Sequence, residues 1–229
     1  MGTVKEKDFV EVEYTASVKS DNFVFDTTDE KIARQNNIHN PNMSYGPLGV
    51  RVGDGALVKG LEQAIIGKEI GKEYTVELSP DNAFGKKLTN LLKIIPSSVF
   101  AREKINPMPG LQINVDGLTG TVKTVAGGRI IVDFNHPLAG KDIIYKIKIN
   151  RLMTDDAEKI KNYLMLRLNV NPNFFTVTID GDVAKIQFKE GISLKELKMD
   201  VLTEKLLSFT KIKRVEYIET KAALKKQAK

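Results

Sequence analysis

The sequence predicts an α+β protein, and two patterns carry that prediction. Residues 9–18 alternate apolar with polar side chains, which is typical of a strand with one buried face. A short helix is predicted where Val58, Leu61 and Ile65 fall at i, i+3 and i+7, and Gly67 is placed to end it in the left-handed conformation. No regular series of strand, helix and strand follows, so a parallel doubly wound sheet is not expected.

Further strands are predicted on both sides of this helix in the sequence. Residues 23–25 indicate a short second strand, and the alternation of apolar and polar side chains returns at residues 74–78 and 145–149. Residues 29–42 are polar and rich in Asn, and we predict a loop there.

Composition excludes several classes of function. Apolar residues make up 41% of the chain and charged residues 28%, which is typical of a protein with a packed core. Cys is absent, which excludes disulfides, thiol catalysis and Cys-bound zinc. With only His39 and His136, we expect neither a metal site nor a cofactor. Neither an apolar leader nor a run of about 18 apolar residues is present, so we expect a cytoplasmic protein that does not enter a membrane.

Nucleic acid and nucleotides are possible ligands to consider, because the net charge is +6 and glycines cluster in two places. The basic cluster Lys221, Lys225, Lys226 and Lys229 is interpreted as a solvated chain end. Gly53-Asp54-Gly55 lacks the third Gly of a dinucleotide-binding loop, and residues 67–73 are one residue too short for a phosphate-binding Walker loop. We therefore expect no nucleotide ligand, and nucleic acid is the less favoured alternative.

A segment with a different residue pattern interrupts the predicted sheet at residues 88–134. Its first part is apolar and broken by Pro96, a turn cluster follows at residues 107–110, and two strand-like runs meet at Gly127-Gly128. This pattern predicts a small β-rich subdomain inserted into a domain formed by residues 1–87 and 135–154. A unit of this size buries little of its surface, so some apolar side chains should remain exposed.

Residues 155–229 predict a third, α+β domain with the order helix, strand, strand, helix, strand. Asp155 and Glu158 indicate a helix start, and Ala157, Ile160, Leu164 and Leu168 form one helical face. Asp180-Gly181 indicates a hairpin, a second helix start lies at Ser193 and Glu196, and Val215 with Tyr217 indicates a closing strand. A unit this small is marginal alone, so we expect it to form a homodimer with a second copy.

Four segments, in order along the chain, resemble the FKBP family of peptidyl-prolyl cis/trans isomerases, specifically its SlyD-like branch with an inserted flap. The resemblance covers residues 4–153 and leaves the C-terminal domain outside. The matching segments are Phe23-Val24-Phe25-Asp26-Thr27-Thr28, the run VGDGALVKGLEQAIIG at residues 52–67, residues 69–73 with Ser79-Pro80-Asp81-Asn82-Ala83-Phe84-Gly85, and Asn135-His136-Pro137-Leu138-Ala139-Gly140-Lys141.

This resemblance implies an antiparallel half-barrel of about five strands around one short helix, and a set of site residues. The implied catalytic residues are Asp26, Tyr14 and Tyr145. The implied substrate-binding residues are Phe25, Leu48, Leu57, Val58, Leu61, Phe84, His136 and Leu138. By the same resemblance the backbone N–H of Val58 holds the substrate carbonyl after proline, and Asp26 acts on the twisted carbonyl. Periodicity alone fits a different role, because Tyr14, Val58, Leu61 and Tyr145 would also serve as ordinary core residues.

The chain departs from the family pattern in three places. Leu61 stands where the family usually has Trp, and Phe84 lacks the Tyr hydroxyl of the turn motif, so weaker binding of macrolide inhibitors is expected. The His- and Cys-rich tail of many SlyD-like proteins has no counterpart in the sequence, so nickel handling is not implied.

The inserted segment resembles the flap that gives SlyD-like proteins chaperone activity. Its implied client-binding residues are Leu91, Leu92, Ile94, Val99 and Phe100, which we expect to be exposed. The partners are then unfolded or nascent proteins with proline-containing segments. Two other functions stay open at this point, namely a holdase chaperone without catalysis and a basic protein associated with nucleic acid.

Overall fold

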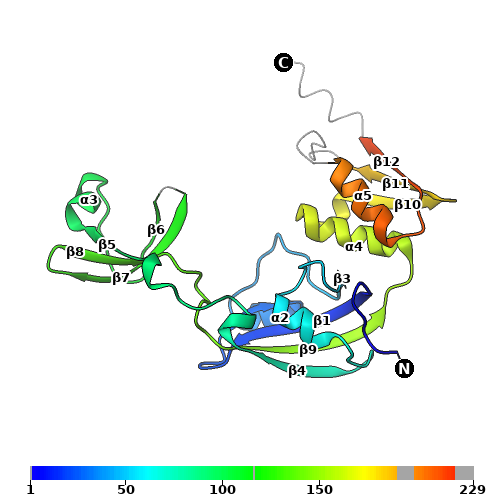
Figure 1. Ribbon diagram of the computed structural model, residues 1–229. Helices are drawn as coiled ribbons and strands as arrows, with labels where there is room; N and C mark the ends of the chain where they lie inside the picture. The colour runs from blue at the N-terminus through cyan, green and yellow to red at the C-terminus, as the bar shows by residue number, and fades with distance from the viewer. Residues whose placement is uncertain (1, 116, 190–198, 220–229) are drawn as a thin grey trace, which may run out of the picture.

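The computed structural model describes residues 2–115, 117–189 and 199–219, and Figure 1 shows their strands gathered in three sheets. The strands are β1 (Phe9–Val18), β2 (Val24–Thr27), β3 (Leu48–Arg51), β4 (Glu73–Leu78), β5 (Leu92–Pro96), β6 (Gln112–Val115), β7 (Leu118–Ala126), β8 (Arg129–Asp133), β9 (Ile143–Leu152), β10 (Phe175–Asp180), β11 (Val183–Phe188) and β12 (Arg214–Glu219). The α-helices are α1 (Glu30–Gln35), α2 (Lys59–Ile65), α3 (Ser97–Arg102), α4 (Asp156–Leu168) and α5 (Met199–Phe209).

The first sheet is antiparallel and is built around β1. One edge of β1 pairs with β9. The other edge pairs with β3 at the N-terminal part of β1 and with β2 at its C-terminal part. β4 completes the sheet by pairing with the far edge of β9. The sheet curls around α2, whose Leu61 and Ile65 are fully buried against the inward side chains of β1 and β9. The predicted α+β fold with an antiparallel half-barrel is therefore confirmed.

One local prediction was wrong, because residues 29–42 are not entirely a loop. They contain α1, which begins after Asp29, whose carboxylate accepts hydrogen bonds from the N–H groups of Lys31 and Ile32. Glu30 and Arg34 form an ion pair one turn apart. Only Ala33 is buried, so the helix has no apolar period that the sequence could reveal.

Residues 88–134 form a second sheet in the order β5-β8-β7-β6, with α3 beside it (Figure 1). The hairpin predicted at Gly127-Gly128 is confirmed, since Ala126 pairs with Arg129 across it. The segment has its own apolar cluster, formed by Phe100, Ile113, Val122, Ile130 and Val132.

The described residues after 154 contain α4, β10, β11, α5 and β12 in that order. Asp155 caps α4 by accepting a hydrogen bond from the Glu158 N–H at 2.8 Å, as predicted. The predicted hairpin joins β10 to β11 through Gly181, and β12 pairs with β11 in parallel. The helix start predicted at Ser193 and Glu196, and the lysines at 221, 225, 226 and 229, lie outside the described residues.

This C-terminal unit packs directly on the first sheet. The Gly49 N–H on β3 donates to Oδ1 of Asn162 on α4 at 3.0 Å. A side chain at Gly49 would lie 2.6 Å from both Asn162 and Met153, so only glycine permits this approach. Phe9 of β1 packs against Phe209 of α5 with 4.8 Å between ring centroids. The contact thus joins one end of the half-barrel to both α4 and α5.

Candidate functional site

The register of the half-barrel places four residues in one row across four strands. Asp26 on β2 lies opposite Ala16 on β1, which lies opposite Tyr145 on β9, which lies opposite Val76 on β4. Tyr14 is on the same face of β1, two residues from Ala16, and its hydroxyl donates to Oδ2 of Asp26 at 2.8 Å. The small Ala16 leaves the carboxylate and the two phenol rings on one side of the sheet.

Both tyrosines remain protonated at neutral pH. Burial raises the pKa of the Tyr14 hydroxyl far above its usual value, and the neighbouring Asp26 carboxylate raises it further. Burial also raises the pKa of Tyr145, with a smaller contribution from Asp26. Tyr14 is consequently fixed as a hydrogen-bond donor to Asp26, which leaves the carboxylate oriented beside the rings.

Aromatic rings extend this row toward the surface. Phe25 meets Phe84 edge to face at 5.7 Å and meets Tyr145 edge to face at 6.5 Å. His136 stacks on Phe84 at 4.8 Å with nearly parallel planes. Such pairs fix ring orientation beyond simple burial. Segments that lie far apart in the sequence thus supply one continuous apolar surface.

The start of α2 faces the same cluster and is held from behind by Glu62. This buried carboxylate, 7% exposed, accepts hydrogen bonds from the N–H groups of Gly55, Ala56 and Leu57 at 3.3, 2.9 and 3.2 Å. Val58, the next residue, caps the helix, and none of the hydrogen bonds found within the described ranges is donated by its N–H. Sequence reasoning missed Glu62, since a glutamate in a helix usually faces solvent.

Gly60 fixes how α2 lies against the turn that carries Phe84. A side chain at Gly60 would lie 2.3 Å from the carbonyl oxygen of Asn82. The turn itself is short, because the Gly85 N–H bonds back to the Pro80 carbonyl at 2.7 Å. This close approach places Phe84 beside the N-terminal end of α2.

The structure brings the eleven site residues expected from the sequence together around one core. The apolar ones belong to the half-barrel core or pack against it, and His136 joins them through Phe84. Burial separates them into layers: Leu57, Leu61 and Tyr145 are buried, His136 is exposed, and the partly buried ones are Tyr14, Phe25, Asp26, Leu48, Val58, Phe84 and Leu138. The exposed and partly buried residues therefore form the outer layer of the cluster.

Comparison with known proteins decides the family. The chain is 36% identical over 155 residues to a protein of Methanocaldococcus jannaschii named short-type peptidyl-prolyl cis-trans isomerase, covering 68% of this chain and 98% of that protein. It is 33% identical over 107 residues to the FKBP-type 16 kDa peptidyl-prolyl cis-trans isomerase of Escherichia coli, covering 45% of this chain and 72% of that protein. The chain belongs to the FKBP-type peptidyl-prolyl cis-trans isomerases.

Other matches concern parts of this FKBP chain. SlyD of Treponema pallidum is 32% identical over 121 residues, covering 48% of this chain and 66% of SlyD. The family model described as "FKBP26, IF domain" matches residues 93–138, which overlap most of the second sheet. The predicted likeness to SlyD-like FKBPs is thereby confirmed.

Not all of the predicted client-binding residues are exposed. Ile94 is 64% exposed and Leu92 is also exposed, whereas Leu91 and Val99 are partly buried. The expectation that Phe100 is exposed was wrong: it is only 4% exposed, because α3 turns it into the small core of the second sheet. Exposed apolar residues that the sequence did not single out in this segment are Leu88, Ile105, Met108, Val115, Leu118 and Val125.

The two chain crossings between the half-barrel and the second sheet are tied together. Asp133, which is buried, accepts from the Asn135 N–H and forms an ion pair with Lys87. The Asn135 side chain bonds both the N–H and the carbonyl of Leu88. Because these ties lie one residue from His136, the second sheet is attached next to the aromatic cluster.

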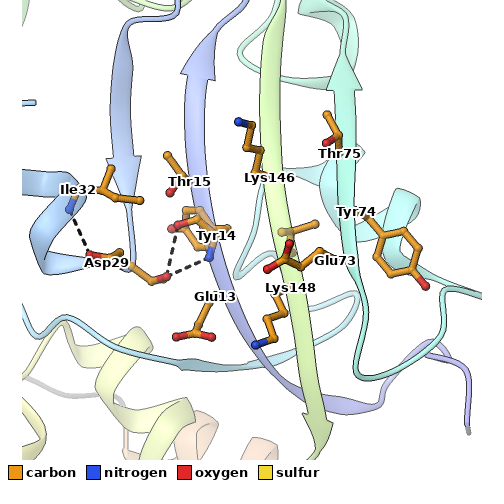
Figure 2. A pocket seen from close by; sticks show the side chains of 12 residues that line it. Glu13, Tyr14, Thr15, Asp29, Ile32, Glu73, Tyr74, Thr75, Lys146 and Lys148 are labelled. Atoms are coloured by element: carbon orange, nitrogen blue, oxygen red, sulfur yellow. Dashed lines mark hydrogen bonds between the residues drawn. The ribbon is translucent and has the colours of Figure 1, made fainter.

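A groove lies on the other face of the half-barrel sheet. Figure 2 shows this groove of about 410 Å³, into which charged and hydroxyl side chains of β1, β4 and β9 point. The side chains of Glu13, Thr15, Thr75, Lys146 and Lys148 alternate along the strands with the inward residues of the aromatic face. None of the predicted site residues except Tyr14 lines this groove.

Two absences concern the described residues alone. Within ranges 2–115, 117–189 and 199–219, no group of three His, Asp or Glu side chains is arranged to hold a metal ion. Across the same ranges, no helix has both the length and the apolar character needed to cross a bilayer.

Proposed function

We propose that this FKBP accelerates cis/trans rotation about X-Pro bonds in unfolded and partly folded proteins, and that it does so at the aromatic cluster of the half-barrel. The observation that carries this proposal is the Tyr14–Asp26 hydrogen bond beside the rings of Phe25, Phe84 and Tyr145. It combines an apolar surface that fits a proline ring with one fixed carboxylate.

Prolyl isomerisation needs a site that favours a twisted amide and requires neither a nucleophile nor a metal. The barrier is about 18–20 kcal/mol because amide resonance is lost as the C–N bond rotates, and the uncatalysed reaction takes tens to hundreds of seconds. The twisted amide is less dipolar than the planar one, so a water-poor apolar surface disfavours the planar ground state more. A difference of about 4–7 kcal/mol corresponds to roughly a thousandfold to hundred-thousandfold acceleration.

In this proposal each group at the site has one role. The proline ring packs against Phe25, Phe84 and Tyr145. The free N–H of Val58, at the start of α2, donates to the substrate carbonyl that follows proline. Asp26, held by Tyr14, acts electrostatically on the carbonyl that rotates out of the amide plane.

We further propose that residues 88–134 act as a flap subdomain that captures unfolded chains as a chaperone. Support comes from the exposed Leu92 and Ile94 on β5, an edge strand that pairs only with β8 among the described strands. Such a surface can hold an apolar segment of a client and so raise the effective concentration of its prolines at the neighbouring site. Deleting residues 88–134 should lower the rate on an unfolded protein far more than on a tetrapeptide, and equal losses would contradict this role.

The units expected from the sequence, residues 1–87 with 135–154, residues 88–134 and residues 155–229, remain part of this proposal, as does a homodimer formed through the last one. Exposed apolar side chains of the C-terminal unit, including Phe174, Val201 and Ile218, support a second copy as the partner. Light scattering at micromolar concentration tests this, and a monomer would remove the dimer from the proposal.

The decisive experiment is a protease-coupled isomerisation assay on X-Pro tetrapeptides with the wild-type chain and with Asp26→Ala. The wild-type chain should accelerate isomerisation, and Asp26→Ala should lower kcat/KM by about ten- to a hundredfold, which corresponds to about 1.4–2.7 kcal/mol. If Asp26→Ala and Tyr145→Ala leave the rate unchanged, the chain is a holdase that uses this surface only for binding.

A further inference from the structure

The loop before Val58 is intrinsically free to move. Asp54 lies between Gly53 and Gly55, and both glycines have positive φ angles, +93° and +74°. Glycines give the backbone access to more conformations than any other residue. Since the loop leads directly to the N–H of Val58, something has to fix it if that N–H is to be presented in one position.

Asp54 is held at its N–H, its carboxylate and its carbonyl, and one of these contacts comes from outside the half-barrel. Its N–H donates to the Arg51 carbonyl at 3.3 Å. Its carboxylate pairs with Nη1 of Arg51 on β3 at 3.1 Å. Its backbone carbonyl accepts a hydrogen bond from Nη2 of Arg167, on the last turn of α4, at 2.7 Å. Arg167 is itself oriented over the ring of Tyr163, with 5.6 Å between the guanidinium carbon and the ring centroid.

Glu62 fixes the next part of the loop. Its carboxylate accepts hydrogen bonds from the N–H groups of Gly55, Ala56 and Leu57. The next N–H along the chain, that of Val58, donates none of the hydrogen bonds within the described residues. The loop is therefore clamped at two adjacent points, by Arg167 at Asp54 and by Glu62 immediately after it.

We propose that Arg167 is a positioning residue for the isomerase site: through the carbonyl of Asp54, the C-terminal unit fixes the loop that presents the Val58 N–H to substrate. This inference rests on the proposed function of that N–H. It assigns the C-terminal unit a direct effect on catalysis within one chain, separate from any contact with a second copy.

Contacts other than that of Arg167 also dock the C-terminal unit on the half-barrel. Asn162 of α4 contacts Gly49, and Phe209 of α5 packs against Phe9. Because Arg167 is exposed and lies at the end of α4, its loss should leave these contacts and the buried core in place. Its specific contribution is the hydrogen bond to the loop, together with the ring contact that orients it.

The test compares Arg167→Ala with the matched variant Lys161→Ala in the full-length chain. Lys161 is exposed on α4, and its side chain forms neither a hydrogen bond nor an ion pair within the described ranges. Arg167→Ala should raise KM for an X-Pro tetrapeptide by about three- to tenfold with a much smaller change in kcat. Lys161→Ala should leave both constants unchanged. Arg167→Lys should give a KM between those of the wild type and Arg167→Ala, because it restores a cationic donor without the planar ring contact.

Hydrogen exchange separates positioning from general loss of structure. Arg167→Ala should speed amide exchange at residues 53–58 and leave β1 and β9 unchanged. The inference is overturned if KM and exchange at residues 53–58 stay at wild-type values, or if exchange rises equally across α4 and the main sheet. A wild-type chain without activity on the tetrapeptide would contradict the proposed function itself, whereas an active wild type with a fully active Arg167→Ala would contradict this inference alone.

Discussion

The two faces of the half-barrel sheet differ in chemistry more than in shape. The inner face carries the rings of Phe25, Phe84 and Tyr145 around a carboxylate fixed by Tyr14. The outer face carries a groove of about 410 Å³, lined by charged and hydroxyl side chains together with Ile32 and Ile147 (Figure 2). The strands are shared, and only the alternation of side chains separates the two surfaces.

If the reaction takes place at the inner face, as proposed, the groove on the outer face is not its site. A solvated surface of mixed charge offers a planar amide as much stabilisation as a twisted one. In the proposed mechanism the rings of the inner face offer an apolar surface beside one oriented carboxylate, and such a surface distinguishes the two forms of the amide. Variants on each face can test this comparison directly.

The largest effect is expected on the inner face. Phe84→Ala removes a ring that packs on both Phe25 and His136, so the surface that receives proline loses its outer wall. We expect kcat/KM for X-Pro tetrapeptides to fall by about tenfold, equivalent to about 1.4 kcal/mol, in a coupled assay. Phe84→Leu, which keeps an apolar side chain, should retain more activity; a fully active Phe84→Ala would show that the proline binds elsewhere.

The inner-face site could be predicted from the sequence because its motifs are local and its residue types are specific. The strand ending in Phe25-Asp26 and the turn carrying Phe84 resemble FKBP segments in their sequence. The Tyr14–Asp26 contact follows once β1 and β2 pair. The strands were predictable from the period-2 alternation, which is strong in β1 and β9, whereas the half-barrel arrangement was implied by the resemblance to FKBPs.

What the sequence did not reveal depends on tertiary contacts. α1 has one buried residue, so no periodic signal exists, and Phe100 was placed at the surface because an apolar run does not say which of its members a short helix turns inward. Glu62 was missed because its role depends on three N–H groups of a loop that folds back over it. The contact of Arg167 with Asp54 spans 113 positions and has no local signature.

A smaller effect is expected from the support behind the inner face. Glu62→Gln keeps the size of the side chain but removes its charge, which weakens the hydrogen bonds from Gly55, Ala56 and Leu57. We expect the free energy of unfolding to fall by about 1–3 kcal/mol in urea titrations and KM for tetrapeptides to rise about threefold. The control is Gln63→Ala, which changes an exposed side chain on the same helix. Equal effects of the two variants would argue against a specific role of Glu62.

The hydroxyls of Tyr14 and Tyr145 on the inner face should ionise at higher pH than those of exposed tyrosines. Burial and Asp26 raise the pKa of Tyr14, and burial raises that of Tyr145, above the ordinary value of 10.0. The stabilisation that this neutral form provides is fully present below pH 10 and is lost as the pH rises above it, because the unfolded chain releases these protons first. Ultraviolet titration should show Tyr14 and Tyr145 among the late-ionising members of the six tyrosines, together with Tyr217, whose pKa burial also raises. Tyr14→Phe should remove one late proton, and an early, reversible titration of Tyr14 would contradict its hydrogen bond to Asp26.

The smallest effect is expected on the outer face, where Thr75 and Lys146 line the groove. Both side chains are exposed, neither forms a hydrogen bond or ion pair within the described part of the chain, and their removal leaves the opposite face of the sheet unaltered. We expect Thr75→Ala and Lys146→Ala to change kcat/KM for tetrapeptides by less than about twofold, within the range typical of surface substitutions. The same assay on an unfolded protein extends the test to longer substrates. A loss of activity on the unfolded protein, with tetrapeptide activity intact, would mean that a client chain also contacts the outer groove. The two faces would then differ in the length of substrate they contact as well as in their chemistry.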